Sequence, residues 1–191
     1  MAEPTHPINN RTKVLVYMAL FVALIAVCAW ISIPFTVPFT LQTFAIFAAV
    51  GLLGGKRATL TVLVYLLLGA IGIPIFSGFS GGFGRLLGTT GGYLIGFIFS
   101  CVVSGLILHK WGRSIFVMAI AMFSGLIVCY AFGTAWFLWV YARTTGPIGL
   151  AAALSWCVVP FLIPDAVKIA LAIFMTKRLE PYVQLSSIKK G

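Results

Sequence analysis

Long runs of hydrophobic residues, separated by short polar or glycine-rich segments, occupy most of this 191-residue chain. A helix that crosses a bilayer needs about 20 mostly apolar residues, and six runs are candidates for such helices. They lie at approximately residues 14–33, 38–54, 58–74, 91–109, 115–141 and 150–176. The second and third runs are short, and the fifth is long enough to tilt or break. The pattern predicts an all-α integral membrane protein with six transmembrane helices.

The polar segments at the two ends divide the chain into three parts. We expect a cytoplasmic tail at residues 1–12, one membrane domain at 13–176 and a basic cytoplasmic tail at 177–191. The first hydrophobic run is too long for a secretory signal and has no small-residue cleavage site, so we expect no cleaved signal. The hydrophobic runs leave little sequence for a soluble domain.

The positively charged residues are concentrated on one side of the predicted membrane domain. Six spans place ten of the 13 Lys and Arg residues on the same side as both termini. Arg85 and Arg143 fall on the opposite side, and Lys168 lies within the last span. Because Lys and Arg are enriched in cytoplasmic loops, this asymmetry predicts cytoplasmic termini and a multi-pass protein of the cell (inner, cytoplasmic) membrane.

Composition supports a membrane protein and narrows its partners. The chain is 61% hydrophobic and 8% charged, whereas soluble domains are about a quarter charged. Its net charge of +10 lies at the membrane edges, where anionic lipid headgroups would be its partners. We therefore expect contacts with membrane lipid and no nucleic-acid binding. The four cysteines fall inside predicted spans without metal-ligand spacing, so no metal or cofactor is expected.

No motif for catalysis or nucleotide hydrolysis is found in the sequence. The stretch GLLGGKRA (51–58) is similar to a phosphate-binding loop, but that pattern requires Gly at Val50 and Ser or Thr at Arg57. His109 lies toward the cytoplasmic end of its predicted span, and no nucleophile–base arrangement is visible. We therefore expect that the protein is not an enzyme.

A glycine-rich segment, residues 74–93, connects the third and fourth predicted helices on the extracellular side. Seven of its 20 residues are glycine, which allows backbone conformations closed to other residues and close approach to a ligand. Phe76, Phe79 and Phe83 argue against a disordered connection, because aromatic side chains favour burial. We interpret the segment as a lid over the extracellular end of the helices, with a plain connection as the alternative.

One acidic residue, Asp165, lies in the middle of a predicted span, and Lys168 follows it by three positions. This spacing puts both side chains on one face of a helix, with Asp165 roughly 16 Å from the cytoplasmic end. Ionisable residues inside a membrane are rare and usually functional, and Pro160 and Pro164 would interrupt the helix beside a cavity. An acceptor and a cation together suit a ligand with an N–H donor and an acidic group. The alternative is a structural ion pair, although such a pair often stabilises no better than apolar packing.

Three smaller motifs concern helix packing or binding. The amide of Gln42, just inside the second span, needs a hydrogen-bond partner, which is either a neighbouring helix or a ligand. Ala19 and Ala23 lie four positions apart and would let another helix approach closely, either within this bundle or from a partner. The fourth span carries a ladder of small residues that predicts a helix-packing face: Gly92, Gly96, Ser100 and Ser104.

Four longer segments resemble the characteristic segments of one transporter family. They are VPFTLQTFA (37–45), LLLGAIGIPIFSG (66–78), LLGTTGGYLIGF (86–97) and IPDAVK (163–168). Their order and spacing are similar to those of the biotin-specific S components of energy-coupling factor (ECF) transporters, the BioY family. The resemblance extends over about residues 13–176. Two positions depart from the usual family pattern, with Phe79 in place of a common glycine and Thr89 in place of a common proline.

The resemblance implies six helices around an outward-facing biotin pocket capped by the glycine-rich lid, and a function in high-affinity biotin capture and uptake. Matching positions imply that Asp165, Lys168 and Tyr93 contact biotin. The other implied lid and pocket residues are Ser77, Gly78, Phe79, Gly81, Gly82, Arg85 and Gln42. Ala19 and Ala23 match the first-helix motif that docks on the transmembrane T component, and two ATPase subunits are the implied source of energy.

The residues alone leave other transport functions open. An S component for another vitamin would share the fold but not these motifs, and a solitary biotin carrier would need no ATPase partners. An ion-coupled transporter could use Asp165 as its carrier, but the chain has one such acid and no detectable internal repeat.

Overall fold

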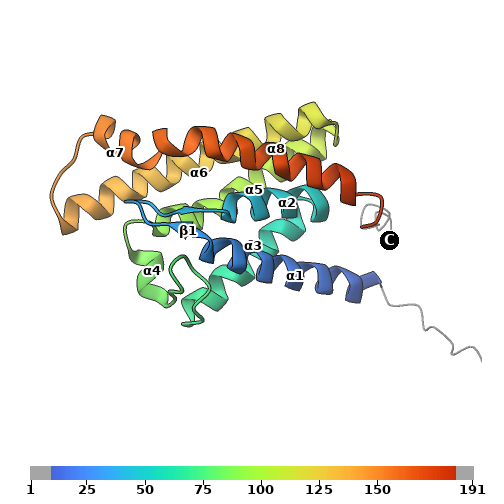
Figure 1. Cartoon of the computed structure of the whole chain (residues 1–191), viewed down its shortest axis with the longest axis horizontal. Coiled ribbons are helices and arrows are strands. Elements are labelled where there is room, and N and C mark those ends of the chain that lie inside the picture. Colours follow the sequence, from blue (N-terminus) through green and yellow to red (C-terminus); the bar gives the residue numbers. More distant parts are fainter. Residues whose placement is uncertain (1–9, 184–191) are drawn as a thin grey trace, which may run out of the picture.

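The structure, a computed structural model, describes residues 10–183 and is mostly helical (Figure 1). Its elements, including one 3-10 helix (η1), are α1 (Asn10–Trp30), β1 (Ser32–Ile33), β2 (Phe39–Thr40), α2 (Gln42–Leu53), α3 (Gly55–Ala70), α4 (Phe83–Leu87), α5 (Gly91–Trp111), α6 (Ile115–Thr144), α7 (Leu150–Cys157), η1 (Val159–Phe161) and α8 (Leu162–Leu179). Most of the two predicted tails, residues 1–12 and 177–191, lies outside the described residues.

A short antiparallel β-hairpin joins α1 to α2, and the prediction of an all-α chain missed it. Strand β1 pairs with β2 in a register that places Ser32 opposite Thr40. Proline has no N–H group and disrupts a helix interior, so Pro34 and Pro38 stop the chain from continuing as a helix. The chain turns back instead, and Thr40 is buried at the end of the hairpin.

Within residues 10–183, four helical stretches are long and apolar enough to cross a membrane. They are Arg11–Trp30, Gly91–Trp111, Ile115–Thr144 and Leu150–Leu179. The predicted second and third spans correspond to α2 and α3, which are shorter, with 12 and 16 residues. A 12-residue helix is about 18 Å long, against a hydrocarbon core of about 30 Å. The chain is therefore a multi-pass helical membrane protein in which four of the six predicted spans have full length.

The two longest predicted spans differ in continuity. Helix α6 runs for 30 residues without a break, although its length had suggested a tilt or a break. The last span is divided into α7, η1 and α8, and Pro160 lies inside η1. The predicted interruption before Asp165 is thus confirmed at Pro160, whereas Pro164 lies within α8 and does not interrupt it. Asp165 lies in the first turn of α8.

Small residues let α5 and α6 pack closely. All four residues of the predicted ladder on α5 are buried. A Cβ atom added at Gly96 would meet Cys129 of α6, and the Ser104 hydroxyl donates a hydrogen bond to the carbonyl of Ala121 in α6 (2.9 Å). The prediction of a helix-packing face is confirmed.

Helix α2 is almost wholly enclosed, since ten of its 12 residues are buried. It packs against α1, α3 and α8, and Gly51 lies directly against Thr176 of α8. Because α2 begins inside the molecule, the polar residues at its start, Gln42 and Thr43, need hydrogen-bond partners from the protein or from a ligand.

The exposure of Ala19 and Ala23 on α1 distinguishes packing within this bundle from contact with a partner. Ala19 and Ala23 are exposed, whereas Ala26 is buried. The interpretation that Ala19 and Ala23 pack within this bundle is therefore wrong. They leave a strip of small side chains facing outward.

The two ends of the helix bundle are distinct. The start of α1 and the end of α8 lie at one end, and α4 and α7 lie at the other (Figure 1). At the first end, Glu180 contacts Arg113 (3.4 Å) and Lys177 (3.2 Å), which ties the end of α8 to the turn between α5 and α6. The candidate site lies between the start of α8 and the glycine-rich segment.

Candidate functional site

The carboxylate of Asp165 is buried and surrounded by hydrogen-bond donors. Asp165 is 3% exposed. Its Oδ1 accepts hydrogen bonds from the Thr43 hydroxyl (2.9 Å) and Lys168 Nζ (2.8 Å), and its Oδ2 accepts one from the Tyr130 hydroxyl (2.5 Å). These donors come from α2, α8 and α6. Since a carboxylate accepts about four such bonds, one acceptor position on Oδ2 remains.

Lys168 is also buried, with 5% of its surface exposed. Besides its bond to Asp165, its Nζ donates to the backbone carbonyl of Thr40 (2.6 Å) and lies 4.0 Å from the centre of the Phe39 ring. An ammonium group has three N–H donors, so one donor has no acceptor among the described residues. The two residues form a largely satisfied ion pair that retains one acceptor and one donor.

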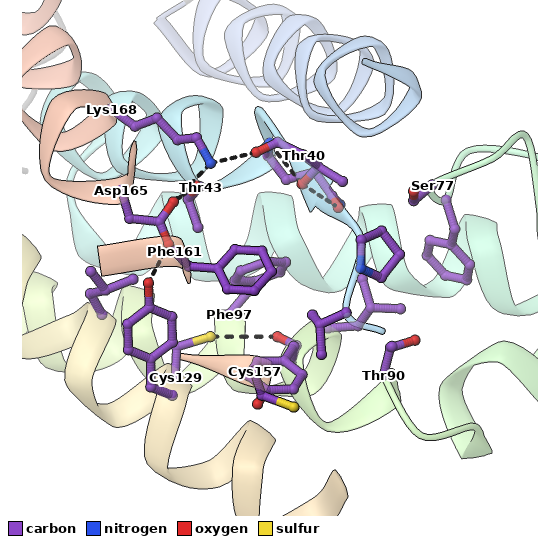
Figure 2. Close-up of a pocket in the computed structure, with 18 of the residues that line it drawn as sticks. Thr40, Thr43, Ser77, Thr90, Phe97, Cys129, Cys157, Phe161, Asp165 and Lys168 are labelled. Atoms are coloured by element: carbon purple, nitrogen blue, oxygen red, sulfur yellow. Dashed lines mark hydrogen bonds and ion pairs between the residues drawn. The ribbon is translucent and has the colours of Figure 1, made fainter. Parts of the chain in front are cut away.

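This ion pair forms one end of a cavity enclosed by α2, α5, α6, the stretch from α7 through η1 to α8, the hairpin and the glycine-rich segment. Asp165 and Lys168 lie at one end of the cavity, and Ser77 and Thr90 lie at the other (Figure 2). The deep end comprises Asp165, Lys168, Thr40, Thr43 and Tyr130. The opposite end, which we call the lid end after the predicted lid, comprises Ser77, Ser80, Arg85 and Thr90.

The walls between the two ends are mainly apolar. They comprise Val37, Pro38, Phe76, Leu94, Phe97, Leu126 and Phe161, together with the thiols of Cys129 and Cys157. Phe161 stacks on Phe39 with ring centres 6.0 Å apart. The interruption of the last span places Phe161 here, because η1 ends immediately before α8 begins.

A tight turn in the glycine-rich segment closes the lid end. The backbones of Phe76 and Ser80 exchange two hydrogen bonds (2.9 and 3.4 Å). Gly78 and Phe79, between them, have positive φ angles of 70° and 52°, a conformation that glycine adopts without strain. The Ser80 hydroxyl accepts a hydrogen bond from Nε of Arg85 (2.9 Å), which holds this guanidinium at the lid end.

Tyr93 lines the cavity, but its hydroxyl already has a partner. It is hydrogen-bonded to the hydroxyl of Thr134 in α6 (2.9 Å). The ring packs against Gly133, where an added Cβ atom would overlap it. Tyr93 therefore forms a fixed part of the wall.

Six of the ten predicted binding residues line the cavity. They are Asp165, Lys168, Tyr93, Ser77, Arg85 and Gln42. The other four, Gly78, Phe79, Gly81 and Gly82, do not line it and instead shape the glycine-rich segment. The N–H of Gly82 donates to the carbonyl of Gly69 (2.7 Å), and the ring of Phe79 stacks on Trp30 (5.0 Å between centres).

Three groups at the deep end were not among the predicted binding residues: Thr43, Tyr130 and the carbonyl of Thr40. A hydroxyl within a long apolar span indicates a candidate site residue, because an unpartnered polar group there is costly. Tyr130 is such a residue. Sequence spacing does not connect these residues to Asp165, since Tyr130 and Thr43 lie 35 and 122 positions away from it.

The cavity suits an elongated ligand with polar groups at both ends and an apolar middle. The deep end offers one acceptor and one donor, and the lid end offers the guanidinium of Arg85. Within residues 10–183, no group of three or more metal-ligating side chains is present. Enclosed hydrogen-bonding groups discriminate strongly between ligands, because a ligand that lacks the matching group leaves them unpaired.

Comparison with known proteins finds relatives over nearly the whole chain. Residues 3–185 match the model of the BioY family. The chain is 41% identical to "Probable biotin transporter BioY" from Pyrococcus horikoshii over 171 residues, which cover 89% of this chain and 98% of the relative. It is also 41% identical to "Biotin transporter BioY" from Thermotoga maritima, over 87% of this chain and 95% of the relative.

A solved structure has the same fold. It is a crystal structure at 2.1 Å of the S-component for biotin from an ECF-type ABC transporter. The TM-score is 0.82 with 30% sequence identity, and the superposition covers 93% of this chain and 95% of that chain. The resemblance inferred from the four sequence segments is confirmed.

Replacing Lys168 with methionine should destabilise the protein by about 3 kcal/mol, because the buried carboxylate of Asp165 loses its cation. Adding Asp165→Asn to Lys168→Met should recover most of this loss, since both charges are then removed. Unfolding in detergent of the wild type, both single variants and the double variant measures the effect. A Lys168→Met protein as stable as the wild type, or a double variant no more stable than Lys168→Met, would contradict mutual stabilisation.

Proposed function

The chain belongs to the BioY family, and we propose that it captures biotin with high affinity as the substrate-binding S component of an ECF-type transporter. Like its relatives, it is a transport protein and not an enzyme. The observation that carries the proposal is the cavity itself. An acceptor and a donor remain at its buried end, and an arginine lies at its other end.

Biotin has chemical groups that fit the deep end and the walls. Its ureido ring presents two N–H donors and a carbonyl, and its fused rings are apolar. We place the ureido ring at the deep end, where the remaining position on Asp165 Oδ2 accepts an N–H and Lys168 donates to the carbonyl. The fused rings then lie between Phe97, Phe161 and Tyr93.

The carboxylate of biotin is assigned to the lid end. The charges of Asp165 and Lys168 cancel, so Arg85 carries the uncompensated charge among the described residues that line the cavity. Hydrogen bonds between a guanidinium and a carboxylate are stronger than those between neutral groups. In this arrangement, Gly78 and Phe79 act by shaping the lid turn that presents Ser77 and Arg85.

We further infer six membrane crossings, with α2 and α3 as short crossings within the bundle. Both ends of the chain are assigned to the cytoplasmic side of the cell membrane, because the basic residues gather there in the predicted topology. The start of α1 and the end of α8 lie at one end of the bundle, in support of this assignment (Figure 1). The glycine-rich segment at the other end then acts as an extracellular lid.

Active uptake is assigned to a complex with other proteins. The sequence contains no nucleotide-binding motif, so two ATPase subunits are proposed to supply the energy. A transmembrane T component is proposed to dock on the strip formed by Ala19 and Ala23, because small exposed residues let a second helix approach closely. The loaded bundle would then reorient within the membrane to release biotin inside.

Tryptophan fluorescence of the purified protein should show saturable binding of biotin, in preference to desthiobiotin, thiamine and riboflavin. The Asp165→Asn variant should bind biotin about 100-fold more weakly, since a buried charged acceptor is lost. It should also be less stable than the wild type, because Lys168 is left without its carboxylate, so the affinities are compared for folded protein only. A well-folded Asp165→Asn protein with unchanged affinity would refute the site. Preferential binding of another vitamin would make the chain an S component for that vitamin.

The Arg85→Gln variant should lose most of the preference for biotin over biotinamide, its neutral amide. This preference should fall by about tenfold, because one charged hydrogen bond is lost. Competition binding with both compounds measures this preference. Arg143→Gln is a matched control, because Arg143 lies over the Trp139 ring (4.3 Å) and does not line the cavity. Full retention of the preference in Arg85→Gln would place the carboxylate elsewhere.

Ala19→Leu combined with Ala23→Leu should abolish co-purification with the T component and ATPase subunits, while biotin affinity stays the same. Leucine side chains would fill the strip and hold the partner helix away. Ala151→Leu, at an exposed alanine of α7, is the control and should assemble normally. Normal assembly of the double variant would exclude this strip as the docking face. Biotin uptake in cells that lack the T component and the ATPase subunits would indicate a solitary carrier.

A further inference from the structure

A continuous series of buried hydrogen bonds runs from the deep end of the cavity to the base of the lid. Lys168 Nζ donates to the Thr40 carbonyl (2.6 Å; Figure 2), and the Thr40 hydroxyl donates to the amide oxygen of Gln42 (3.2 Å). The amide nitrogen of Gln42 donates to the Tyr65 hydroxyl (2.8 Å), which donates to the Ile75 carbonyl (2.8 Å). Five residues from separate parts of the chain are linked in this way.

Each side chain in the middle of this series has a protein partner on either side. Gln42 is 3% exposed, and both ends of its amide have protein partners, so it links protein groups although it also lines the cavity. Tyr65 is 0% exposed, and its hydroxyl both accepts and donates. Buried side chains that are hydrogen-bonded to one another in series hold each other in place.

The last bond of the series fixes the point where the lid turn begins. Ile75 is followed by Phe76, whose ring meets the Tyr65 ring edge-on, with 5.6 Å between centres and 73° between planes. The Phe76 ring also fills the space beside Gly69, where an added Cβ atom would overlap it. Because Phe76 and Ser77 line the cavity, the position of Ile75 sets how the lid stands over the deep end.

We propose that Tyr65 is a positioning residue that couples occupancy of the deep end to closure of the lid. A ligand bound at Asp165 and Lys168 fixes Thr40, and the bonds through Gln42 and Tyr65 then fix the base of the lid. This rests on the proposed function, because it assumes that biotin occupies the deep end. Tyr65 should therefore control how long biotin stays bound more than how fast it enters.

Two native thiols report on the lid independently of biotin. Cys129 and Cys157 line the cavity, whereas the other described cysteines, Cys28 and Cys101, are buried outside it. A small maleimide that enters the cavity by the lid end reaches the first pair. The labelling rate of Cys129 and Cys157, followed by mass spectrometry, therefore measures lid opening in the empty protein.

The Tyr65→Phe variant keeps the ring and removes the hydroxyl. Stopped-flow fluorescence should show biotin dissociating about tenfold faster, with association changed by less than about twofold, because the variant loses both bonds of the hydroxyl, from Gln42 and to Ile75, that connect the deep end to the lid. In the absence of biotin, Cys129 and Cys157 of this variant should be labelled faster than those of the wild type. Tyr141→Phe is the matched control and should equal the wild type, since Tyr141 stacks on Phe137 (5.2 Å) and its hydroxyl has no partner among residues 10–183.

A second substitution keeps the test decisive if Tyr65→Phe does not fold. Gln42→Met breaks the series one bond earlier and should also speed dissociation and labelling. Because both changes break one series, the double variant should dissociate no faster than either single variant. Additive effects, slower association with unchanged dissociation, or a Tyr65→Phe protein that matches Tyr141→Phe would overturn the coupling. A wild type that binds no biotin would instead refute the proposed function, while labelling would still test the link from Tyr65 to the lid.

Discussion

A carboxylate and an ammonium group that are removed from water destabilise a fold unless they are paired and hydrogen-bonded. Asp165 and Lys168 meet this condition with partners from three other parts of the chain, namely Thr43 in α2, Tyr130 in α6 and Thr40 in the hairpin. These three parts must therefore meet around the start of α8. The cavity is the space left where they meet, so the same requirement that holds the pair also shapes the site.

The two ends of the cavity differ in how firmly they are held. At the deep end, helices meet through small residues and buried hydrogen bonds, so it is rigid. The lid end is more exposed, since Gly78, Phe79 and Arg85 are exposed. Besides the Gly82–Gly69 and Tyr65–Ile75 bonds and the stacking of Phe79 on Trp30, it is held by the backbone bonds between Phe76 and Ser80, the Arg85–Ser80 bond, and a bond from the Trp30 indole to the Pro74 carbonyl (2.9 Å). Segments with few buried contacts open at low free-energy cost. The proposed lid would thus move while the deep end keeps its geometry.

Features that depend on local chemistry could be predicted from the sequence. Hydrophobic runs located the helices, Pro160 marked the interruption of the last span, and the three-residue spacing placed Asp165 beside Lys168. Features that depend on tertiary structure could not, because no spacing reveals that Thr43 and Tyr130 are bonded to Asp165. The hairpin was missed because two-residue strands carry no periodic pattern, and the exposure of the alanine strip on α1 depends on which faces the other helices cover.

The pairing of Asp165 with Lys168 at 2.8 Å also affects how the membrane potential would act on a bundle that reorients in a membrane. Moving one elementary charge through 100 mV involves about 2.3 kcal/mol. The paired charges of Asp165 and Lys168 sum to zero, so the membrane potential does no net work on them. Arg85 differs, because its positive charge would be balanced only when a carboxylate is bound. Among the described groups that line the cavity, the membrane potential would therefore do net work on Arg85 when the bundle is empty. It would do no net work on these groups when a carboxylate is bound.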